Sequence, residues 1–490
     1  MATGGHPKAE KLPLSTRIFS GIGTTAFGIK DQGFGGFLML YYNQVLGLPA
    51  AWVGTAIMIA MVADAFFDPI VGHVSDQCRS RWGRRHPFMY AAALPLALFY
   101  FLLWSPPALG PAALSAYLLV TAILVRFALS IYEIPSMALL SELSSDYDER
   151  TALVAWRYFF GTIGGIGITI IAFRYFLVPT AAQPVGQLNA AGYHEYAIVA
   201  SILMLIFVLA AALGTHNRIP QLRIDAAPQE RAKLSELGSA VRDVFGNRVY
   251  LIMLGAMLLL SIAAGLNSAL GIYVNTYFWQ LNSSAIATLT TAAMVGVLLA
   301  FLVALPLSKK FGKKRGALIL FLFPLMLVFL PVFARLGGVL PLHSPLVIPI
   351  LTAQAILLTA CAIGGSILLV SMISDVTDHV RLDTGRKSEG LLFSLVVLIN
   401  KAISGLGVLF GGMLLSAVGF PAKAQPGKVP EHVVDAMVIS FVALYFVFAL
   451  LGILSLIKFP ITRESHEDAL ARLDATAAGA LHEPVADLGR

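Results

Sequence analysis

Long apolar segments alternate with short polar ones along almost the whole chain. Twelve of these segments hold about 20 or more mostly apolar residues, which is enough for a helix to cross about 30 Å of hydrocarbon. They cover residues 18–46, 52–76, 87–106, 112–140, 152–178, 194–214, 247–275, 284–307, 316–335, 346–373, 389–417 and 433–458. The pattern predicts an all-α polytopic membrane protein with twelve transmembrane helices.

A polar stretch in the middle of the chain separates six of these segments from the other six. We therefore expect an N-terminal six-helix bundle, a C-terminal six-helix bundle and a site between two related halves. The predicted regions are an N-terminus at 1–17, bundles at 18–214 and 247–459, a loop at 215–246 and a tail at 460–490. A short amphipathic helix is expected within the loop, at 233–244.

Basic residues are concentrated in every second connection between the apolar segments. These connections contain residues 79–85, Arg150, 218–242, 309–315 and 381–387, whereas the alternate loops hold only Arg335, Lys423 and Lys428. Cytoplasmic loops of membrane proteins carry an excess of Lys and Arg. The bias predicts that both termini lie in the cytoplasm, with the protein in the plasma membrane, or in the inner membrane of a bacterium.

The composition narrows the class further. Apolar residues make up 58% of the chain and charged residues 12%, whereas a soluble domain carries roughly 25% charged residues. The net charge of +7 is spread over loops and forms no stripe that would bind nucleic acid. Cys78 and Cys361 predict neither a disulfide framework nor a metal site. We expect a monomer whose partners are the lipid bilayer and a small solute.

Two carboxylates, Asp64 and Asp68, lie in the second apolar segment. On a helix, residues four apart share a face, and ionisable residues inside a membrane segment mark ion or proton pathways by default. The pair can supply oxygen ligands to Na⁺, or repulsion and desolvation can raise one pKa and make a proton carrier. The plainer alternative is that these acids only pair with basic residues and hold helices together.

Four stretches resemble motifs of known transporters. Gly72, Asp76 and the basic run Arg81-Trp82-Gly83-Arg84-Arg85 resemble the cytoplasmic signature of the major facilitator superfamily. Residues 64–72, 79–88 and 373–390 resemble motifs of the glycoside–pentoside–hexuronide:cation symporters, the melibiose-permease group. The resemblance implies two six-helix bundles that rock around a central site. It also implies that a sugar or related solute is coupled to sodium, protons or lithium.

The same resemblance suggests roles for single residues. Asp64 and Asp68 match the cation-binding pair, and Glu133 stands where the family often has an acid or amide near cation and sugar. Lys401 matches a lysine across the cavity from the acids, where it would hold the site until Na⁺ displaces it, or form a static salt bridge. Arg157 resembles an arginine near the cytoplasmic gate, or anchors the helix at the interface.

Other polar residues are candidates for the solute site. Arg126 can hold Glu133 or a carboxylate of another helix, or it can bind an anionic substrate. Asp31 and Gln32 are the candidates in the first segment. The family's aromatic residue after the proline of helix four is absent, because Ser136 and Met137 stand there, which argues against a galactoside. The full set of solute candidates is Asp31, Gln32, Arg126, Glu133, Asn267, Tyr273, Gln354 and Lys401.

Charged residues near the predicted cytoplasmic ends are candidates for coupling or gating. Asp76 can pair across the loop that follows it. The full set is Asp76, Arg81, Arg84, Arg85, Arg157, Asp375, Asp378, Arg386 and Lys401. Trp104 and Trp279 lie near helix ends and are expected in the aromatic belts at the membrane interface.

The sequence therefore predicts a symporter that couples a sugar, glycoside or hexuronide to Na⁺ or H⁺ and needs no other cofactor. A close alternative is the same machine carrying an amphiphilic solute such as a lysolipid. An enzyme is not expected, because the chain has no His-Glu-x-x-His, nucleophile elbow or metal-spaced His or Cys cluster. A sensor or scaffold built on the same fold would be expected to lack the ion-binding residues.

Overall fold

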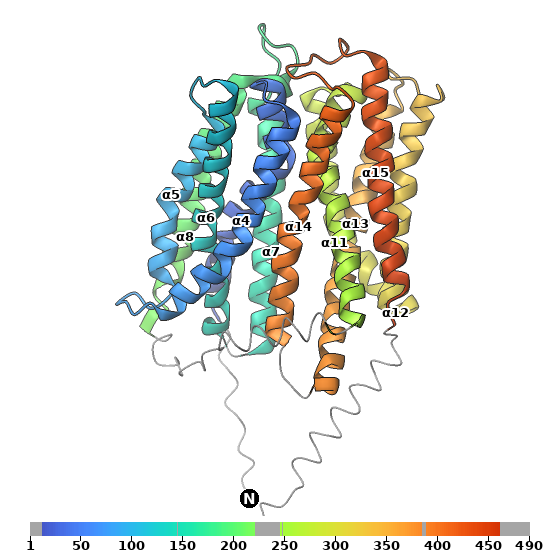
Figure 1. Ribbon diagram of the computed structural model, residues 1–490. Helices are drawn as coiled ribbons and strands as arrows, with labels where there is room; N and C mark the ends of the chain where they lie inside the picture. The colour runs from blue at the N-terminus through green and yellow to red at the C-terminus, as the bar shows by residue number, and fades with distance from the viewer. Residues whose placement is uncertain (1–11, 145, 221–245, 247, 385–388, 461–490) are drawn as a thin grey trace, which may run out of the picture. The chain divides into compact units, whose positions relative to one another are not determined.

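The computed structural model describes residues 12–144, 146–220, 246, 248–384 and 389–460 (Figure 1). Within these ranges it gives the backbone of residues 147, 148 and 374–402 but not the surroundings of their side chains. The predicted amphipathic helix at 233–244 lies outside the described residues.

All described elements are helical, as predicted, and they cover each of the twelve apolar segments. The elements are α1 (Leu14–Ile22), α2 (Thr24–Gln32), η1 (Gly33–Phe37), α3 (Leu38–Leu40), η2 (Tyr41–Val45), α4 (Ala50–Gln77), α5 (His86–Trp104), α6 (Pro111–Leu143), α7 (Tyr147–Ile171), η3 (Ala172–Phe176), η4 (Gly186–Leu188), α8 (Ala190–His216), α11 (Arg248–Tyr273), η5 (Val274–Phe278), α12 (Ser283–Leu336), α13 (Val347–Thr384), α14 (Glu389–Ala417) and α15 (Glu431–Ile457).

Among the described residues, nine helices are long and apolar enough to cross a membrane. The difference from twelve has local causes. The first segment is divided into the short pieces α1 to η2, and only residues 403–417 of α14 have described side chains, so this helix is represented by the apolar stretch Ile403–Ala417. In addition, α12 carries two predicted segments and is interrupted at Gly312, whose φ of 79° is non-helical. This break lies in the basic stretch 309–315, where a loop was predicted.

The chain divides into two compact units. Unit 1 comprises residues 1–230, 264–291 and 401–441, and unit 2 comprises 231–263, 292–400 and 442–490. This division does not follow the predicted halves, because parts of α11, α12, α14 and α15 belong to unit 1. The two-bundle organisation stays a prediction.

In unit 1 the first five long helices pack side by side (Figure 1). α4 packs on α6, α5 packs on both α6 and α8, and the short helices α1 and α2 pack on α7. Glycines allow α2 and α7 to approach closely: a Cβ at Gly28 would lie 1.9 Å from the carbonyl oxygen of Gly161. Small residues at helix contacts are typical of membrane proteins, where packing drives association.

The first segment ends in a distinctive turn. Leu46 N–H donates to Tyr41 O at 3.0 Å, five residues back, and Leu48 N–H donates to Tyr42 O at 2.9 Å. Gly47 lies between them with φ 92°, a left-handed conformation that glycine adopts without a steric penalty. The helix is thus closed by a π-type turn followed by a left-handed residue.

The same turn recurs after α11. Trp279 N–H donates to Val274 O at 2.9 Å, and Leu281 N–H donates to Asn275 O at 2.8 Å. The left-handed position is taken by Gln280, with φ 49°. The backbone thus repeats one turn at the ends of the first and seventh predicted segments.

An aromatic core fills the same end of unit 1. The ring of Trp104 stacks on Tyr193, with centroids 5.8 Å apart and an interplanar angle of 3°, and it also contacts Tyr41 and Tyr196. Trp104 is fully buried and Trp279 nearly so. The prediction that these two tryptophans lie in interfacial belts is therefore wrong, because both pack inside the protein.

Unit 2 has its own apolar core, built from α11, α12, α13 and α15. Its buried members include Met253, Leu320, Cys361, Leu368 and Leu456. In α13, Gln354 donates to the carbonyl oxygen of Leu327 in α12 at 2.8 Å. This solute candidate thus links two helices of unit 2.

Candidate functional site

The two acids of α4 share one face, as the helical spacing predicts, and that face packs on α6. The hydroxyl Oγ of Ser130 in α6 lies 3.1 Å from Asp64 Oδ1 and 2.7 Å from Asp68 Oδ1. Asp64 is buried and Asp68 is half-buried. A serine hydroxyl has one proton and can donate to only one carboxylate at a time. The serine hydroxyl therefore bridges the two acids by donating to one or the other.

Arg126, one turn before Ser130 on α6, pairs with the first acid. Its Nη1 donates to Asp64 Oδ2 at 3.0 Å, and its guanidinium lies 4.7 Å from the centroid of the Phe34 ring. Arg126 is 4% exposed. Of the partners considered from the sequence, the structure gives Arg126 a carboxylate of another helix. A charge buried this deeply needs such a partner.

Glu133, one turn after Ser130, pairs with a different arginine. Arg157 Nη2 in α7 donates to Glu133 Oε1 at 2.8 Å, and Arg157 Nη1 donates to Ser136 Oγ at 3.0 Å. The hydroxyl of Thr24, in α2, donates to the carbonyl oxygen of Arg157 at 2.7 Å. Arg157 is buried, so its setting is not that of an interfacial anchor. The α4, α6 and α7 helices thus carry two neighbouring acid–arginine pairs.

Two polar atoms in these pairs have no hydrogen-bond partner among the described residues. They are Arg126 Nε, a donor, and Glu133 Oε2, an acceptor, and both are buried. Leaving such a group unsatisfied costs about 1–3 kcal/mol. A molecule with hydroxyl groups can satisfy both kinds of atom.

The first segment places its charged candidates differently. Lys30 is buried, with its Nζ 4.4 Å from the centroid of the Phe27 ring and 3.6 Å from Asp31 Oδ1. The Asp31 side chain is 64% exposed, and Gln32 is half-buried. The structure therefore pairs the buried Lys30 with the exposed Asp31.

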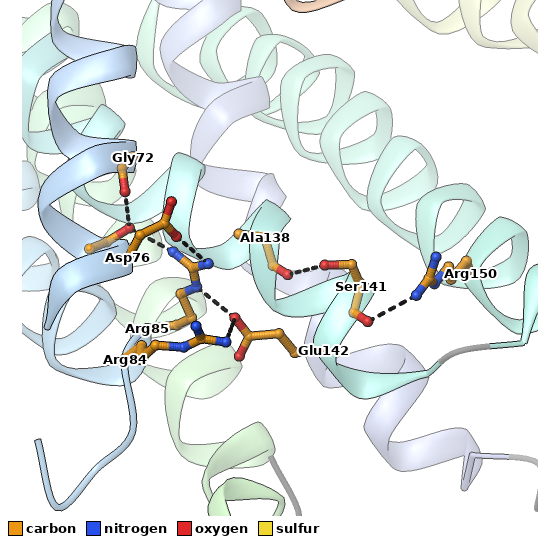
Figure 2. A network of polar contacts seen from close by, with 9 residues as sticks. Gly72, Asp76, Arg84, Arg85, Ala138, Ser141, Glu142 and Arg150 are labelled. Carbon is orange, nitrogen blue, oxygen red and sulfur yellow. Dashed lines mark hydrogen bonds and ion pairs between the residues drawn. The ribbon is translucent and has the colours of Figure 1, made fainter. Parts of the chain in front are cut away.

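A charged network holds the other end of α4 (Figure 2). Arg85 forms an ion pair with Asp76, donates to Ser75 Oγ at 2.8 Å through Nη1 and donates to Glu142 Oε1 at 2.9 Å through Nε. Arg84 Nη2 reaches the same Glu142 oxygen at 3.2 Å. The expected pairing of Asp76 across the following loop is present. Arg85 is the centre of the network, because it joins the loop to both α4 and α6.

Side chains beside this network fix the neighbouring backbone. Ser141 Oγ donates to Ala138 O at 2.8 Å, and Arg150 Nη2 donates to Ser141 O at 3.2 Å (Figure 2). The exposed Arg81 lies over the ring of Trp82, 5.3 Å from its centroid. Within the described contacts, Arg81 thus stacks on its neighbour, whereas Arg84 and Arg85 carry the ion pairs.

None of the described contacts joins the remaining predicted residues to the α4–α6–α7 pairs. Tyr273 is fully buried and donates to Asn43 Oδ1 at 2.9 Å, Asn267 is exposed on α11, and Gln354 belongs to unit 2. Arg386 lies outside the described residues, as do the side chains of Asp375, Asp378 and Lys401.

Sequence reasoning missed two central residues. Ser130 and Glu142 both lie on α6, three residues before Glu133 and nine residues after it. The signal that could have found Ser130 is its helical spacing, because it falls on the same face as Arg126 and Glu133. Among the described residues, no group of three or more His, Cys, Asp or Glu lies close enough to hold a metal ion. The α4–α6 cluster consists of two carboxylates and a hydroxyl.

Comparison with known proteins identifies the family. A family model described as MFS/sugar transport protein matches residues 19–463. The chain is 26% identical to an uncharacterised symporter, sll1374, of Synechocystis, over 95% of this chain and 98% of the relative. It is 25% identical to an isoprimeverose transporter of Lactiplantibacillus pentosus, over 84% and 82%. It is 26% identical to the inner membrane symporter YicJ of Escherichia coli, over 83% of each chain.

Solved structures share the fold. A D-xylose-proton symporter superposes with a TM-score of 0.62 at 15% identity, over 91% of this chain and 98% of that one. The nucleoside transporter NupG superposes with a TM-score of 0.61 at 16% identity, over 91% and 99%. With a family match over most of its length, the chain belongs to the MFS/sugar transport protein family of the major facilitator superfamily and is a transporter, not an enzyme.

Proposed function

We propose that the protein is a cation-coupled symporter that carries a sugar, glycoside or hexuronide by alternating access. The observation that carries this proposal is the position of Ser130, whose hydroxyl lies within hydrogen-bond distance of both Asp64 and Asp68. Three oxygens gather there on two membrane-length helices, α4 and α6. Ionisable residues inside membrane segments mark ion or proton pathways by default, so this cluster suits a coupling site.

The coupling ion is Na⁺ or H⁺. Carboxylate and hydroxyl oxygens are ligands that suit hard cations. Proton coupling would use the same carboxylate oxygens. Arg126 forms an ion pair with Asp64, and Asp68 shares the Ser130 hydroxyl with that acid. We propose that Asp68 changes its partner during the cycle.

The proposed solute site adjoins the ion site on α6. Arg126 Nε and Glu133 Oε2 are a buried donor and a buried acceptor without partners in the described part of the chain. Sugars carry hydroxyls that can both donate and accept, so they suit this pair. Asp31, Gln32 and Asn267 are further candidates for the solute. The names of relatives, including an isoprimeverose transporter, are compatible with a glycoside.

Lys401 is proposed from the sequence as the cation that exchanges with the coupling ion. The charged cluster at Asp76, Arg84 and Arg85, together with Arg81, Arg157, Asp375, Asp378 and Arg386, is proposed to take part in gating or coupling. The basic loops favour cytoplasmic termini, and one relative is named an inner membrane symporter. We therefore propose a multi-pass protein of the plasma membrane, or of a bacterial inner membrane, that works as a monomer.

Uptake into proteoliposomes tests the proposal. The panel contains neutral sugars, glycosides, uronates and a lysolipid, each measured with and without a Na⁺ gradient and with a pH gradient. We expect gradient-driven accumulation of at least one sugar, glycoside or uronate. Accumulation of the lysolipid alone would show that the solute is amphiphilic and not a sugar, glycoside or hexuronide. Failure of every cation gradient to drive uptake of any member would reject cation symport.

The ion site is tested by Asp68→Asn. We expect this change to abolish stimulation by the coupling ion while solute exchange down a gradient persists. The matched control is Glu195→Gln, which neutralises an exposed acid of α8 and should leave stimulation intact. Unchanged ion dependence in Asp68→Asn would remove these acids from the coupling site.

A further inference from the structure

Two buried glutamines join segments of unit 1 that are far apart in the sequence. The first is Gln187 in η4, in the connection between α7 and α8. Its Nε2 donates to Thr276 Oγ1 at 3.2 Å and to Leu281 O at 2.8 Å, and its Oε1 accepts from Ser283 Oγ at 3.1 Å. Gln187 is 1% exposed. The connection between α7 and α8 is thereby joined to η5 and to the turn that follows it.

The second glutamine is Gln44, in the turn that closes the first segment. Its Nε2 donates to Asn43 Oδ1 at 2.6 Å and to Pro421 O at 3.1 Å. Its Oε1 accepts from Tyr277 Oη at 3.0 Å and from Ala424 N–H at 2.9 Å. Every hydrogen-bonding position of this amide is therefore occupied, and the partners include the connection between α14 and α15.

The Gln44–Tyr277 contact has a place in the internal repeat. These residues are 233 apart and stand at the same position of the two recurring turns. The bond therefore links the ends of the first segments of the two predicted halves. Tyr273 adds a parallel link, because its hydroxyl donates to Asn43 Oδ1 at 2.9 Å. The contacts form one buried polar cluster rather than a scattered set.

The chemistry of this cluster suits a contact that forms and breaks repeatedly. Its side chains are neutral amides and hydroxyls, and water can replace each partner when the cluster opens. The net contribution of such a bond is only about 0.5–1.5 kcal/mol. Several bonds acting together can keep the end closed, yet none imposes the desolvation cost that would trap a buried ion pair.

We propose that Gln44 and Gln187 are the latch that holds this end of unit 1 closed, and that it must open for the solute site to face that side. This inference rests on the proposed transport by alternating access. It adds two positioning residues that contact neither the acids of α4 nor the arginines of α6 and α7 in the described structure. With the proposed orientation, the latch lies at the external end.

The test measures opening directly. Spin labels are placed at the exposed Ala182 and Ala422, one on each of the two connections, in a Cys78→Ser, Cys361→Ser background of the full chain. Pulsed dipolar spectroscopy in lipid nanodiscs then gives the distance distribution. Gln187→Leu and Gln44→Leu each remove an amide at similar volume. We expect the ratio of the longer-distance to the shorter-distance population to rise roughly tenfold in each variant.

The matched control is Gln183→Leu. Gln183 lies in the same connection as Gln187, but its Oε1 only accepts from the nearby Val185 N–H at 3.3 Å. We expect its distance distribution to equal that of the parent. If a leucine variant fails to fold, Gln187→Asn, which keeps the amide but shortens its reach, is measured instead and should also shift the ratio. Rescue by Gln187→Glu is not expected, because a carboxylate lacks the donor.

An unchanged distance distribution in folded variants of both glutamines would overturn the latch. Thermal unfolding is measured in parallel: a fall in melting temperature with an unchanged distribution would assign the glutamines a structural role only. Failure of the latch is distinguishable from failure of the proposed function. The first appears in the distance data alone, and the second appears as an absence of cation-driven uptake by the unaltered protein.

Discussion

The guanidinium of Arg126 donates to the carboxylate of Asp64 at 3.0 Å, and both side chains are buried. Removing one member of a buried ion pair leaves a charge without compensation, which costs about 3–5 kcal/mol. We therefore expect Arg126→Gln and Asp64→Asn each to lower the melting temperature in detergent substantially. The double variant should lose less than the sum of the single losses.

The double-mutant cycle supplies the control for this prediction. Strict additivity of the two losses would show that the pair does not interact in the folded protein. It would also leave Asp64 available as an independent ligand for the coupling ion.

Ser130 should affect the binding of the coupling ion more than the binding of the solute. Ser130→Ala removes the hydroxyl between Asp64 and Asp68 and should raise the half-saturating concentration of the coupling ion by roughly tenfold, the effect of losing one hydrogen bond or ligand to charged groups. Ser130→Thr keeps the hydroxyl and should lie close to the parent. The measurement is initial uptake against ion concentration.

A serine elsewhere on the same helix provides the control for Ser130. Ser115 Oγ is buried and has no partner among the described residues, so Ser115→Ala should leave ion dependence unchanged. An equal shift in both alanine variants would point to a general effect on α6.

Arg84 and Arg85 of the charged network should differ in their contribution to the stability of the protein. Arg85 is 6% exposed at its side chain and Arg84 is 28% exposed, although both reach Glu142. Exposed pairs contribute about 0–1 kcal/mol, whereas disruption of a buried pair costs about 3–5 kcal/mol. Arg85→Gln should thus lower the melting temperature much more than Arg84→Gln. Equal losses would contradict the central position of Arg85.

The close approach of α2 and α7 can be tested with one methyl group. Gly28→Ala places a Cβ 1.9 Å from Gly161 O, so the helices must separate, at a cost of about 1–3 kcal/mol or more. The control is Gly167→Ala, which adds a methyl group to α7 itself. This methyl group meets nothing within 4 Å, so the change should stabilise the helix slightly. The measurement is thermal unfolding. A Gly28→Ala variant as stable as Gly167→Ala would show that the helices adjust without strain.

Much of the fold could be predicted from the sequence, because length and apolarity specify membrane helices directly. The shared face of Asp64 and Asp68 followed from helical spacing for the same reason. The partners of these acids did not follow. Ser130 is a hydroxyl on a long apolar helix, where serine is unremarkable, and the choice of Arg126 for Asp64 and Arg157 for Glu133 depends on how α4, α6 and α7 pack.

The polar cluster at the recurring turns was beyond sequence reasoning for a different cause. Gln44 lies at the end of the first segment and Gln187 lies in a connection, two places where polar residues are expected to meet water. Only the tertiary structure shows that both are buried. The aromatic positions misled in the same way: Trp104 stands near a helix end, which favours an interfacial position, but its ring packs on Tyr193 inside unit 1.

The amide chemistry of the Gln44 and Gln187 contacts has a consequence for the medium in which the protein works. The Debye length, over which salt screens the interaction of exposed charges, falls from about 10 Å at 0.1 M to about 3 Å at 1 M. Hydrogen bonds between neutral amides are hardly affected by this screening. In the Asp76–Arg85 pair only the aspartate side chain is exposed, at 52% against 6% for the arginine, so this pair responds to ionic strength through its exposed member, and the neutral glutamine cluster does not. A change in salinity therefore acts unequally on the two polar clusters of unit 1, weakening the one built from charges.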